Sequence, residues 1–211
     1  MLNNILQWNI NSLKSKFSKL ETILKDNNIQ VFALQETKNP TGKQIKIRGY
    51  NIYAKDRDAH GGGVLVAVHN NLPSTQLHVD TNLELVASTV HFKNYHINIC
   101  SFYLPDHTQI TFENLNDIFN KIPNPKIILG DVNAKHVSWG AAYDCPRGKI
   151  ITDCILDNNL VILNDGSPTR YDIRRNIYSH IDISCCSLAL ADKLDWAVTV
   201  VIIFLYPLNI I

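Results

Sequence analysis

The strongest constraint on the fold is the rhythm of the apolar residues, which come in short β-rich runs bounded by Gly, Asn, Asp or Pro. Runs of about 4–8 residues of this kind are typical of strands in packed sheets. Lys93-Asn94, between two alternating runs, predicts a hairpin turn. The predicted strands are Asn4–Trp8, Val31–Leu34, Asn51–Ala54, Val64–Val68, Leu85–Phe92, Tyr95–Phe102, Lys126–Leu129, Leu160–Leu163 and Tyr178–Ile183.

Apolar residues at helical spacing occur in three segments. The first is predicted to begin behind Ser12 as N-cap, and the second to stop at Pro123. Many strands with few helices in mixed order predict an α/β fold of two packed sheets with helices outside. The apolar stripes are Leu13, Phe17, Leu20 and Leu24; Phe112, Leu115, Phe119 and Ile122; and Ile151 and Ile155, the last ending near Asn158-Asn159.

The charge balance limits the partners that the whole chain can attract. Lys+Arg number 20 and Asp+Glu 19, a net charge of +1. This excludes a strongly basic nucleic-acid clamp as a property of the whole chain and leaves a local basic face open. Hydrophobic residues make up 45% of the 211 residues, which excludes a disordered tail and fits one large domain or two small ones.

The cysteines and the two ends of the chain carry few functional signals. The five cysteines form no CxxC pair, and we expect buried thiols in a reducing compartment, with Cys185 and Cys186 on opposite faces of a strand. The first residues have no basic and no apolar region of a signal peptide, so we expect an intracellular protein. The uncharged run from Ala197 to Ile211 is shorter than the roughly 20 residues of a membrane span and contains Pro207.

Polar residues follow several apolar runs, where α/β folds collect their ligands. Asn9 follows the first run, and Glu36 follows the run that ends at Leu34. Because Mg²⁺ prefers one or two carboxylates and keeps several waters, Glu36 is a candidate metal ligand, the alternative being a turn cap.

A second group of polar residues follows Ile127–Leu129. We expect Gly130 to let the backbone turn, and Asp131 and Asn133 to point to the same side, one acting on a water or leaving oxygen and the other on a phosphate oxygen. The alternative is an Asx-turn that closes the strand.

Two further candidates lie in later runs. Asp182 lies in an apolar run and needs a partner, either a histidine that it orients or an ion pair with Arg174 or Arg175. The Tyr103 hydroxyl can donate to a phosphate, the alternative being an ordinary tyrosine at a strand end.

Taken in order, these residues carry a family resemblance. Asn9, then LQET around Glu36, YLP after Phe102, GDVNA around Asp131, and SHID up to Asp182 form a series over most of the chain. The sequence resembles the endonuclease/exonuclease/phosphatase superfamily, and more closely the apurinic-like endonuclease domain of Jockey-type non-LTR retrotransposons. Supporting details are His60–Val64, Ala134-Lys135-His136, Trp139-Gly140 and Ser167-Pro168-Thr169.

The resemblance implies a fold and a chemistry. The family fold is a four-layer α/β sandwich, DNase I-like, with two mixed sheets flanked by helices. Family chemistry is Mg²⁺-dependent phosphodiester hydrolysis, with Mn²⁺ as a substitute ion. The transposon branch nicks double-stranded target DNA and leaves the 3′ hydroxyl that primes reverse transcription. The resemblance further implies a longer polyprotein with reverse transcriptase, a nuclear location if functional, and no membrane partner.

The resemblance also assigns roles, residue by residue. Glu36 matches the metal ligand, with Asn9 beside it. Asp131 matches the residue that activates or aligns the attacking water, and Asp182 the carboxylate that orients a catalytic histidine. The remaining matches are Asn133 as a contact to the transition-state phosphate, Tyr103 as a phosphate donor, and Thr169 as a phosphate or DNA-backbone contact.

The chain departs from the family pattern at its end, where the family has Ser-Asp-His. Here Val201-Ile202-Ile203-Phe204-Leu205 follows instead. A coding run for Ser-Asp-His-Phe-Pro, AGT GAT CAT TTT CCT A, gives Val-Ile-Ile-Phe-Leu when it is read one nucleotide later. We therefore hypothesise that residues 1–200 are the endonuclease-like domain and that 201–211 are a frameshifted, aberrant apolar tail. Asp182 would then lack its histidine, the last core strand would end early, and the tail would be an aggregation hazard. Sequencing the locus tests this, since an intact in-frame codon run for Ser-Asp-His would refute it.

The alternatives from the same residues are a catalytically dead fragment or binding module of the same fold, and a phosphatase of the superfamily that acts on inositol phosphates or lipids. The GDVNA and AKHVSWG runs favour the transposon branch over the phosphatase. Local DNA contacts are expected from Arg57, Arg170, Arg174 and Arg175, unless these are simply solvated surface residues.

Overall fold

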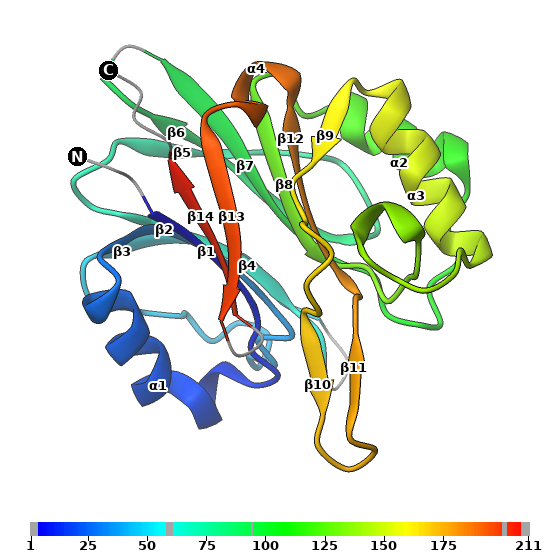
Figure 1. Ribbon diagram of the computed structural model, residues 1–211. Helices are drawn as coiled ribbons and strands as arrows, with labels where there is room; N and C mark the ends of the chain where they lie inside the picture. Colours follow the sequence, from blue (N-terminus) through cyan, green and yellow to red (C-terminus); the bar gives the residue numbers. More distant parts are fainter. Residues whose placement is uncertain (1–3, 58–60, 94, 200–201, 208–211) are drawn as a thin grey trace.

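The computed structural model describes residues 4–57, 61–93, 95–199 and 202–207. Two six-stranded sheets pack face to face, with α1 outside the first sheet and α2 and α3 outside the second (Figure 1). This is the DNase I-like four-layer sandwich that the sequence predicts.

The first sheet contains the first strands of the chain and the last. Its order is β13-β14-β1-β2-β4-β3, and β1 and β2 run parallel while the other neighbours are antiparallel. The strands are β13 (Leu194–Thr199), β14 (Ile202–Pro207), β1 (Asn4–Asn9), β2 (Ile29–Gln35), β4 (Val64–His69) and β3 (Tyr50–Lys55), and the covering helix is α1 (Leu13–Asp26).

The second sheet has the order β5-β6-β7-β8-β12-β9, with β7 and β8 parallel. Its strands are β5 (Ser74–Leu77), β6 (Glu84–His91), β7 (His96–Tyr103), β8 (Lys126–Asp131), β12 (Asp182–Ser187) and β9 (Leu160–Ile162). The helices on this side are α2 (Phe112–Asn120), the 3₁₀ helix Val137–Trp139 and α3 (Pro146–Asp157), while the short α4 (Leu188–Ala191) connects β12 to β13. A separate ribbon of β10 (Arg170–Asp172) and β11 (Ile177–Ser179) projects beyond the ends of both sheets (Figure 1).

Three apolar clusters fill the spaces between these layers. One lies under α1, a second between the two sheets, and a third between the second sheet and α2 and α3. Cys185 belongs to the third cluster and Cys186 to the second, so the two side chains point to opposite faces of β12, as predicted. All five cysteines are free thiols, and all except the half-buried Cys145 are buried.

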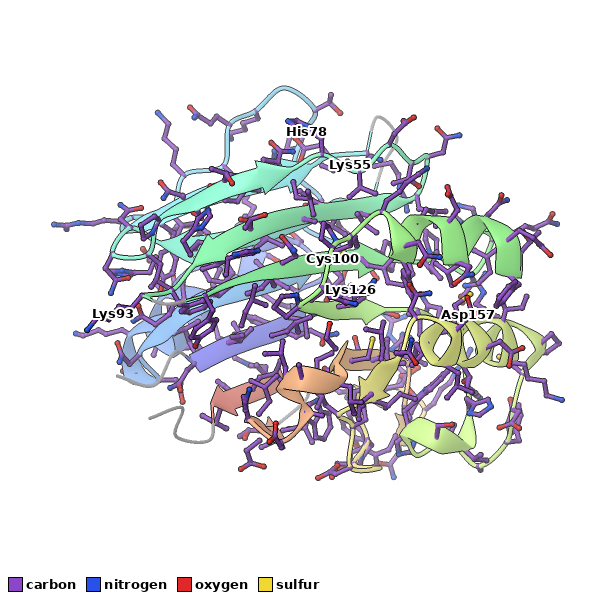
Figure 2. All side chains as sticks on the ribbon, turned by 90° about the horizontal axis from the view of Figure 1, so that it is seen from above. Lys55, His78, Lys93, Cys100, Lys126 and Asp157 are labelled. Carbon is purple, nitrogen blue, oxygen red and sulfur yellow. The ribbon has the colours of Figure 1, made fainter. Side chains whose placement is uncertain are left out.

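A buried lysine joins the second sheet to its helices. Lys126, at the start of β8, is 2% exposed, and its ammonium donates to the carbonyls of Phe119 and Ile122 and to Asn158 Oδ1. Figure 2 shows Lys126 and Cys100 inside the molecule, close to one another. The positive charge thus lies at the carboxyl ends of α2 and α3, where the helix dipoles favour it.

The predicted helices are confirmed, and most of the predicted strands are present. The run Tyr178–Ile183 is an exception, because it divides into β11 and β12. Ser12 precedes α1 with φ at 90°, but its side chain makes no capping hydrogen bond. Gly130 does not turn the chain. It lies within β8, where a Cβ would come within 2.6 Å of the Phe102 carbonyl oxygen on the neighbouring strand. Residues 60 and 94, which carry part of the predicted glycine run and hairpin turn, lie outside the described residues.

The tail differs most from expectation. The prediction that the last core strand ends early is wrong, because Ile202–Pro207 form β14 between β1 and β13. Ile203 and Leu205 pack between the sheets, whereas Ile202 and Phe204 pack in the cluster under α1. Because both faces of an inner strand are covered, an uncharged run rich in β-branched residues fits there. These residues are therefore buried, and the expected aggregation hazard does not arise from them. In the described part of the chain, no helix has the length and apolar character needed to cross a membrane.

Candidate active site

The pairing of the strands brings the predicted site residues to one end of the sandwich. Asn9 pairs with Gln35 at the carboxyl ends of the parallel strands β1 and β2, so Glu36 follows directly beside it. Tyr103 pairs with Asp131 at the carboxyl ends of β7 and β8, and Asp182 pairs with Asp131 from the antiparallel β12. Five of the predicted residues therefore meet where the two sheets face each other.

Asn9 lies at the centre of this group. Its Nδ2 donates to Glu36 Oε1 at 2.9 Å and to Asp131 Oδ2 at 2.6 Å, and so joins one carboxylate from each sheet. Its Oδ1 accepts from the backbone N–H of Asn11 at 3.1 Å. The amide nitrogen therefore occupies the place between two carboxylates where repulsion would otherwise be strongest.

Glu36 is held by three neighbours. Besides Asn9, the Tyr103 hydroxyl donates to Oε1 at 3.1 Å and the Lys38 ammonium lies 3.4 Å from Oε2. Burial alone raises the pKa of Glu36, but the hydrogen bond from Asn9, the charge of Lys38 and the Tyr103 hydrogen bond together lower that pKa below its usual value. Glu36 is thus ionised at neutral pH.

Tyr103 lies beside a half-buried ion pair that sequence analysis missed. The Arg57 guanidinium lies 5.8 Å from the centre of the Tyr103 ring and pairs with Glu84, which also accepts from the backbone N–H of Gly63. Burial and the nearby charges of Glu36 and Asp131 raise the pKa of the Tyr103 hydroxyl, so it stays protonated and remains a donor. Arg57, for which a DNA contact is predicted, forms this ion pair with its side chain 23% exposed.

Asp131 and Asn133 form the Asx-turn that was the alternative expectation. The backbone N–H of Asn133 donates to Asp131 Oδ1 at 3.0 Å, and the Asn133 φ is 43°. Asn133 Nδ2 donates to the Leu104 carbonyl at 3.0 Å. Asp131 consequently faces the cavity described below, whereas Asn133 lines a neighbouring groove.

Asp182 is held by Thr169, and the charge of Arg170 at the start of the ribbon also favours its ionised form. Thr169 is 2% exposed, and its hydroxyl accepts from the backbone N–H groups of Ile181 and Asp182. The ion pair expected with Arg174 or Arg175 is absent among the described residues. The Arg175 guanidinium lies 4.0 Å from Asp172 Oδ2, and the backbone N–H groups of both arginines donate to Asp172 Oδ1 at the turn of the ribbon.

Two buried carboxyl groups therefore lie side by side. Burial raises the pKa of Asp131 to about 6, against hydrogen bonds from Asn9 and Asn133 that lower it. Burial, followed by the charge of Asp131, raises the pKa of Asp182 well above its usual value. Like charges in a dry site disfavour double ionisation, so the pair holds a proton more readily than free aspartates do.

A cavity of about 360 Å³ opens onto these side chains. Its lining combines the carboxylates with basic and aromatic residues of α1, β1 and the ribbon, among them Trp8, Lys16, Lys19, Arg170 and Tyr171. No histidine is among the described residues that line it, and Ile203 takes part in the wall. A larger hollow of about 910 Å³, beside α1 and β3, includes none of the predicted site residues, so volume alone does not locate the site.

His136 and His180 are the histidines nearest to Asp131 and Asp182 in the sequence, and their contacts lie elsewhere. His136 Nδ1 accepts from the backbone N–H of Ser138 and caps the 3₁₀ helix, and the His136 ring lies beside Trp139. The backbone carbonyl of His180 accepts from the Trp139 indole. Neither histidine is among the described residues that line the cavity with Asp182.

The donor set fits Mg²⁺ through Glu36. Glu36 offers an ionised carboxylate, and Mg²⁺ typically takes one or two carboxylates and keeps its waters. Among the residues that the structure describes, no group of three or more His, Cys, Asp or Glu side chains forms a dedicated metal cage. Asn9 presents its nitrogen to the carboxylates, so a ligand role for Asn9 requires its amide to turn.

A buried hydrogen-bond chain beneath the site was also missed from the sequence. Trp196 Nε1 donates to Ser184 Oγ at 3.1 Å, and Ser184 Oγ donates to Gln7 Oε1 at 2.8 Å. Since an indole N–H can only donate, the serine proton must go to the glutamine carbonyl, which turns Gln7 Nε2 away. That nitrogen is buried without a hydrogen-bond partner among the described residues, and Gln7 lines the cavity directly opposite Ile203 in the β1–β14 pair.

Comparisons with known proteins find sequence relatives of this chain. The family model for "Endonuclease-reverse transcriptase" matches residues 97–201. The RNA-directed DNA polymerase from the mobile element jockey of Drosophila melanogaster is 28% identical over 169 residues, which are 78% of this chain and 18% of that protein. The chain thus spans about a fifth of the length of this relative.

Solved structures extend the match to nearly the whole chain. The endonuclease domain of TRAS1, a telomere-specific non-LTR retrotransposon, superposes with a TM-score of 0.84 at 22% identity, covering 99% of this chain and 100% of that one. An AP endonuclease from Archaeoglobus fulgidus superposes with a TM-score of 0.75 at 17% identity, covering 99% and 100%. The chain is thus a homologue of jockey-type mobile-element proteins, and it has the fold of the retrotransposon and AP endonucleases on which it superposes.

Proposed function

We propose that this chain is a Mg²⁺-dependent endonuclease domain that nicks double-stranded DNA, and that its activity is impaired by the residues at 201–203. The observation that carries the proposal is the Asn9 amide that joins Glu36 and Asp131 across the two sheets, in a cavity shared with Asp182. Paired carboxylates, a protonated tyrosine and nearby cations suit phosphoryl transfer, which needs positioning and charge stabilisation.

Each residue has a distinct role in this proposal. Glu36 would hold Mg²⁺, or Mn²⁺ in its place, and the bound ion would neutralise charge on the scissile phosphate. Asp131 would take a proton from the attacking water, for which a pKa of about 6 is well matched. The Tyr103 hydroxyl, which stays protonated, would donate a hydrogen bond to a phosphate oxygen. Asn133 and Thr169 would contact phosphate from the two sides of Arg170.

The basic residues around the cavity support DNA as the substrate. Lys16 and Lys19 both lie 5.6 Å from the Trp8 ring centre on one side of the cavity. Arg170 lines both the cavity and a neighbouring groove of about 440 Å³, which continues toward Lys135 and Arg175. A nucleic-acid strand laid along both hollows would therefore pass cations on each side of the carboxylates.

The ribbon of β10 and β11 would extend this contact. The Tyr171 and Tyr178 rings lie against each other with centres 4.6 Å apart and planes tilted by 31°. Ile173, Ile177 and Tyr178 are exposed near Arg174 and Arg175. Exposed aromatic and basic side chains on a projecting ribbon are suited to contact a duplex groove.

The wider role follows from the relatives and remains part of the proposal. The jockey relative is an RNA-directed DNA polymerase of which this chain matches 18%. We propose that the nick supplies a 3′ hydroxyl from which a reverse transcriptase of the same polyprotein extends, which requires access to nuclear DNA.

The proposed impairment has a structural counterpart at Ile203. Under the frameshift hypothesis, Ser-Asp-His would occupy 201–203 and place histidine at 203. Ile203 lines the cavity together with Asp131 and Asp182, and it faces Gln7, whose buried amide nitrogen lacks a partner. A histidine at position 203 would place a polar imidazole in the cavity lining, opposite Gln7. The absence of histidine from the described cavity lining also favours the second candidate, a DNA-binding module without activity.

A plasmid assay tests the proposal. We expect slow conversion of supercoiled plasmid to the open circle in Mg²⁺, abolished by EDTA and by Glu36→Ala. Nicking that persists in Glu36→Ala would contradict the assigned site. DNA binding without nicking would support the inactive module, and release of phosphate from a soluble inositol phosphate would point to the phosphatase branch.

A further inference from the structure

Arg147, the second residue of α3, makes an unusual set of contacts. Both terminal nitrogens of its guanidinium donate only to backbone carbonyls, and no carboxylate lies within ion-pair distance among the described residues. The contacts are Nη1 to Leu104 at 3.2 Å, Pro105 at 3.0 Å and Val132 at 3.3 Å, and Nη2 to Asp106 at 2.7 Å and Thr108 at 2.6 Å.

These carbonyls belong to two segments that carry site residues. Leu104 follows Tyr103 at the end of β7, and Val132 follows Asp131 at the end of β8. The same Leu104 carbonyl accepts from Asn133 Nδ2 at 3.0 Å, and the Leu104 N–H donates to the Asp131 carbonyl at 2.9 Å. One guanidinium therefore joins the backbone behind Tyr103, Asp131 and Asn133.

Hydrogen bonds and close packing fix the beginning of α3, so the backbone that carries Arg147 is held in place. Cys145 Sγ accepts from the backbone N–H groups of Lys135 and Gly148 at 3.2 and 3.3 Å. A Cβ at Gly148 would collide with the Lys135 carbonyl, which shows how closely the helix packs on the loop after β8.

We propose that Arg147 is a positioning residue of the active site, which holds the loop at 104–108 and, through the Leu104 carbonyl, sets the orientation of the Asn133 amide. The role of Arg147 in an active site rests on the proposed function, whereas its hydrogen bonds to the backbone do not depend on that proposal. The planar guanidinium presents donors in a fixed fork, whereas the ammonium of lysine is a single point and cannot reach carbonyls spread over two segments. A direct phosphate contact is the competing role for an arginine at this end of the fold, yet both terminal nitrogens are already used.

Hydrogen exchange and NMR test the contacts in the full chain. Arg147→Lys and Arg147→Ala are compared with Lys149→Ala, an exposed residue on the same helix that loses the same charge. We expect the backbone amides of Leu104 and of residues 106–110 to exchange about tenfold or more faster in both Arg147 variants, because charge-assisted hydrogen bonds are lost. The ¹⁵N-labelled side-chain amide signal of Asn133 should shift in both and stay unchanged in Lys149→Ala. Unchanged exchange and an unchanged Asn133 signal in Arg147→Lys would overturn the proposal.

DNA titrations separate positioning from direct contact. For a fluorescent duplex in Mg²⁺ at several salt concentrations, positioning predicts weaker binding in Arg147→Lys with the same salt slope as the unmodified chain. A direct phosphate contact predicts a slope smaller by about 0.9 in Arg147→Ala, and that result would overturn the proposal. If the unmodified chain binds no duplex, the proposed function fails, while the exchange and NMR measurements still decide the role of Arg147.

Discussion

Ser184→Ala should destabilise the protein strongly, although it removes one oxygen atom. Ser184 is fully buried; it accepts from the Trp196 indole and donates to Gln7. Alanine leaves the indole N–H and the glutamine carbonyl buried without this partner. Each such group costs about 1–3 kcal/mol, so the free energy of unfolding should fall by about 2–6 kcal/mol.

The matched variant is Gln7→Met, which keeps the side-chain length and removes the other end of the chain of hydrogen bonds. It loses the acceptor for Ser184 but also removes the buried amide nitrogen that has no partner, two effects of about 1–3 kcal/mol each and of opposite sign. We expect a net change within about 2 kcal/mol.

Urea unfolding followed by tryptophan fluorescence measures both variants. The slope of the unfolding free energy against urea must stay the same for the comparison to hold. A loss in Gln7→Met equal to or larger than that in Ser184→Ala would refute the reasoning, because Gln7 Nε2 would then have a partner.

Three further predictions concern the carboxylates and the buried lysine. Lys126→Met should lower the free energy of unfolding in urea by about 2–4 kcal/mol, against little change for the exposed control Lys149→Met, since buried carbonyls lose a charged donor. Asn9→Ala should weaken Mg²⁺ binding in calorimetry by about tenfold or more, because charge-assisted hydrogen bonds to both carboxylates are lost; unchanged affinity would contradict the site. In EDTA, stability should fall as pH rises from the usual aspartate value of 3.8 through about 6, since the folded state binds the Asp131 proton more tightly than the unfolded chain does. Asp131→Asn should flatten that pH dependence, and an equally steep dependence would argue against it.

Strand ends made much of the site predictable from the sequence. Asn9, Glu36 and Asp131 each lie at the end of a largely apolar run, and parallel pairing of neighbouring strands brings such ends to one edge. The order of these motifs along the chain then gave the family, which single residues did not.

The ribbon was not predicted because its residues resemble those of a buried strand. The predicted run Tyr178–Ile183 begins with Tyr178, which is exposed, and strand pairing stops at His180 before β12 begins. Period-2 patterns indicate burial on one face and cannot reveal a two-stranded ribbon that projects into solvent.

The supporting residues escaped prediction for a different reason. Arg147 binds carbonyls, which every residue possesses, so no side-chain pattern marks its partners. Gln7 and Ser184 meet across 177 residues of sequence, and only the packing of two sheets brings them together. The place of β14 in the sheet also could not be predicted from the sequence. An uncharged run rich in β-branched residues fits an inner strand whether or not it arose by a frameshift.

Plasmid nicking by a chain with a restored triplet tests the central claim most directly. The comparison is between the unmodified chain and the triple variant Val201→Ser, Ile202→Asp, Ile203→His, each with and without Glu36→Ala, in Mg²⁺. We predict that the triple variant nicks at least about a hundredfold faster than the unmodified chain, and that Glu36→Ala abolishes the gain. Equal rates for the unmodified chain and the folded triple variant would contradict the claim that these residues impair an otherwise complete endonuclease site.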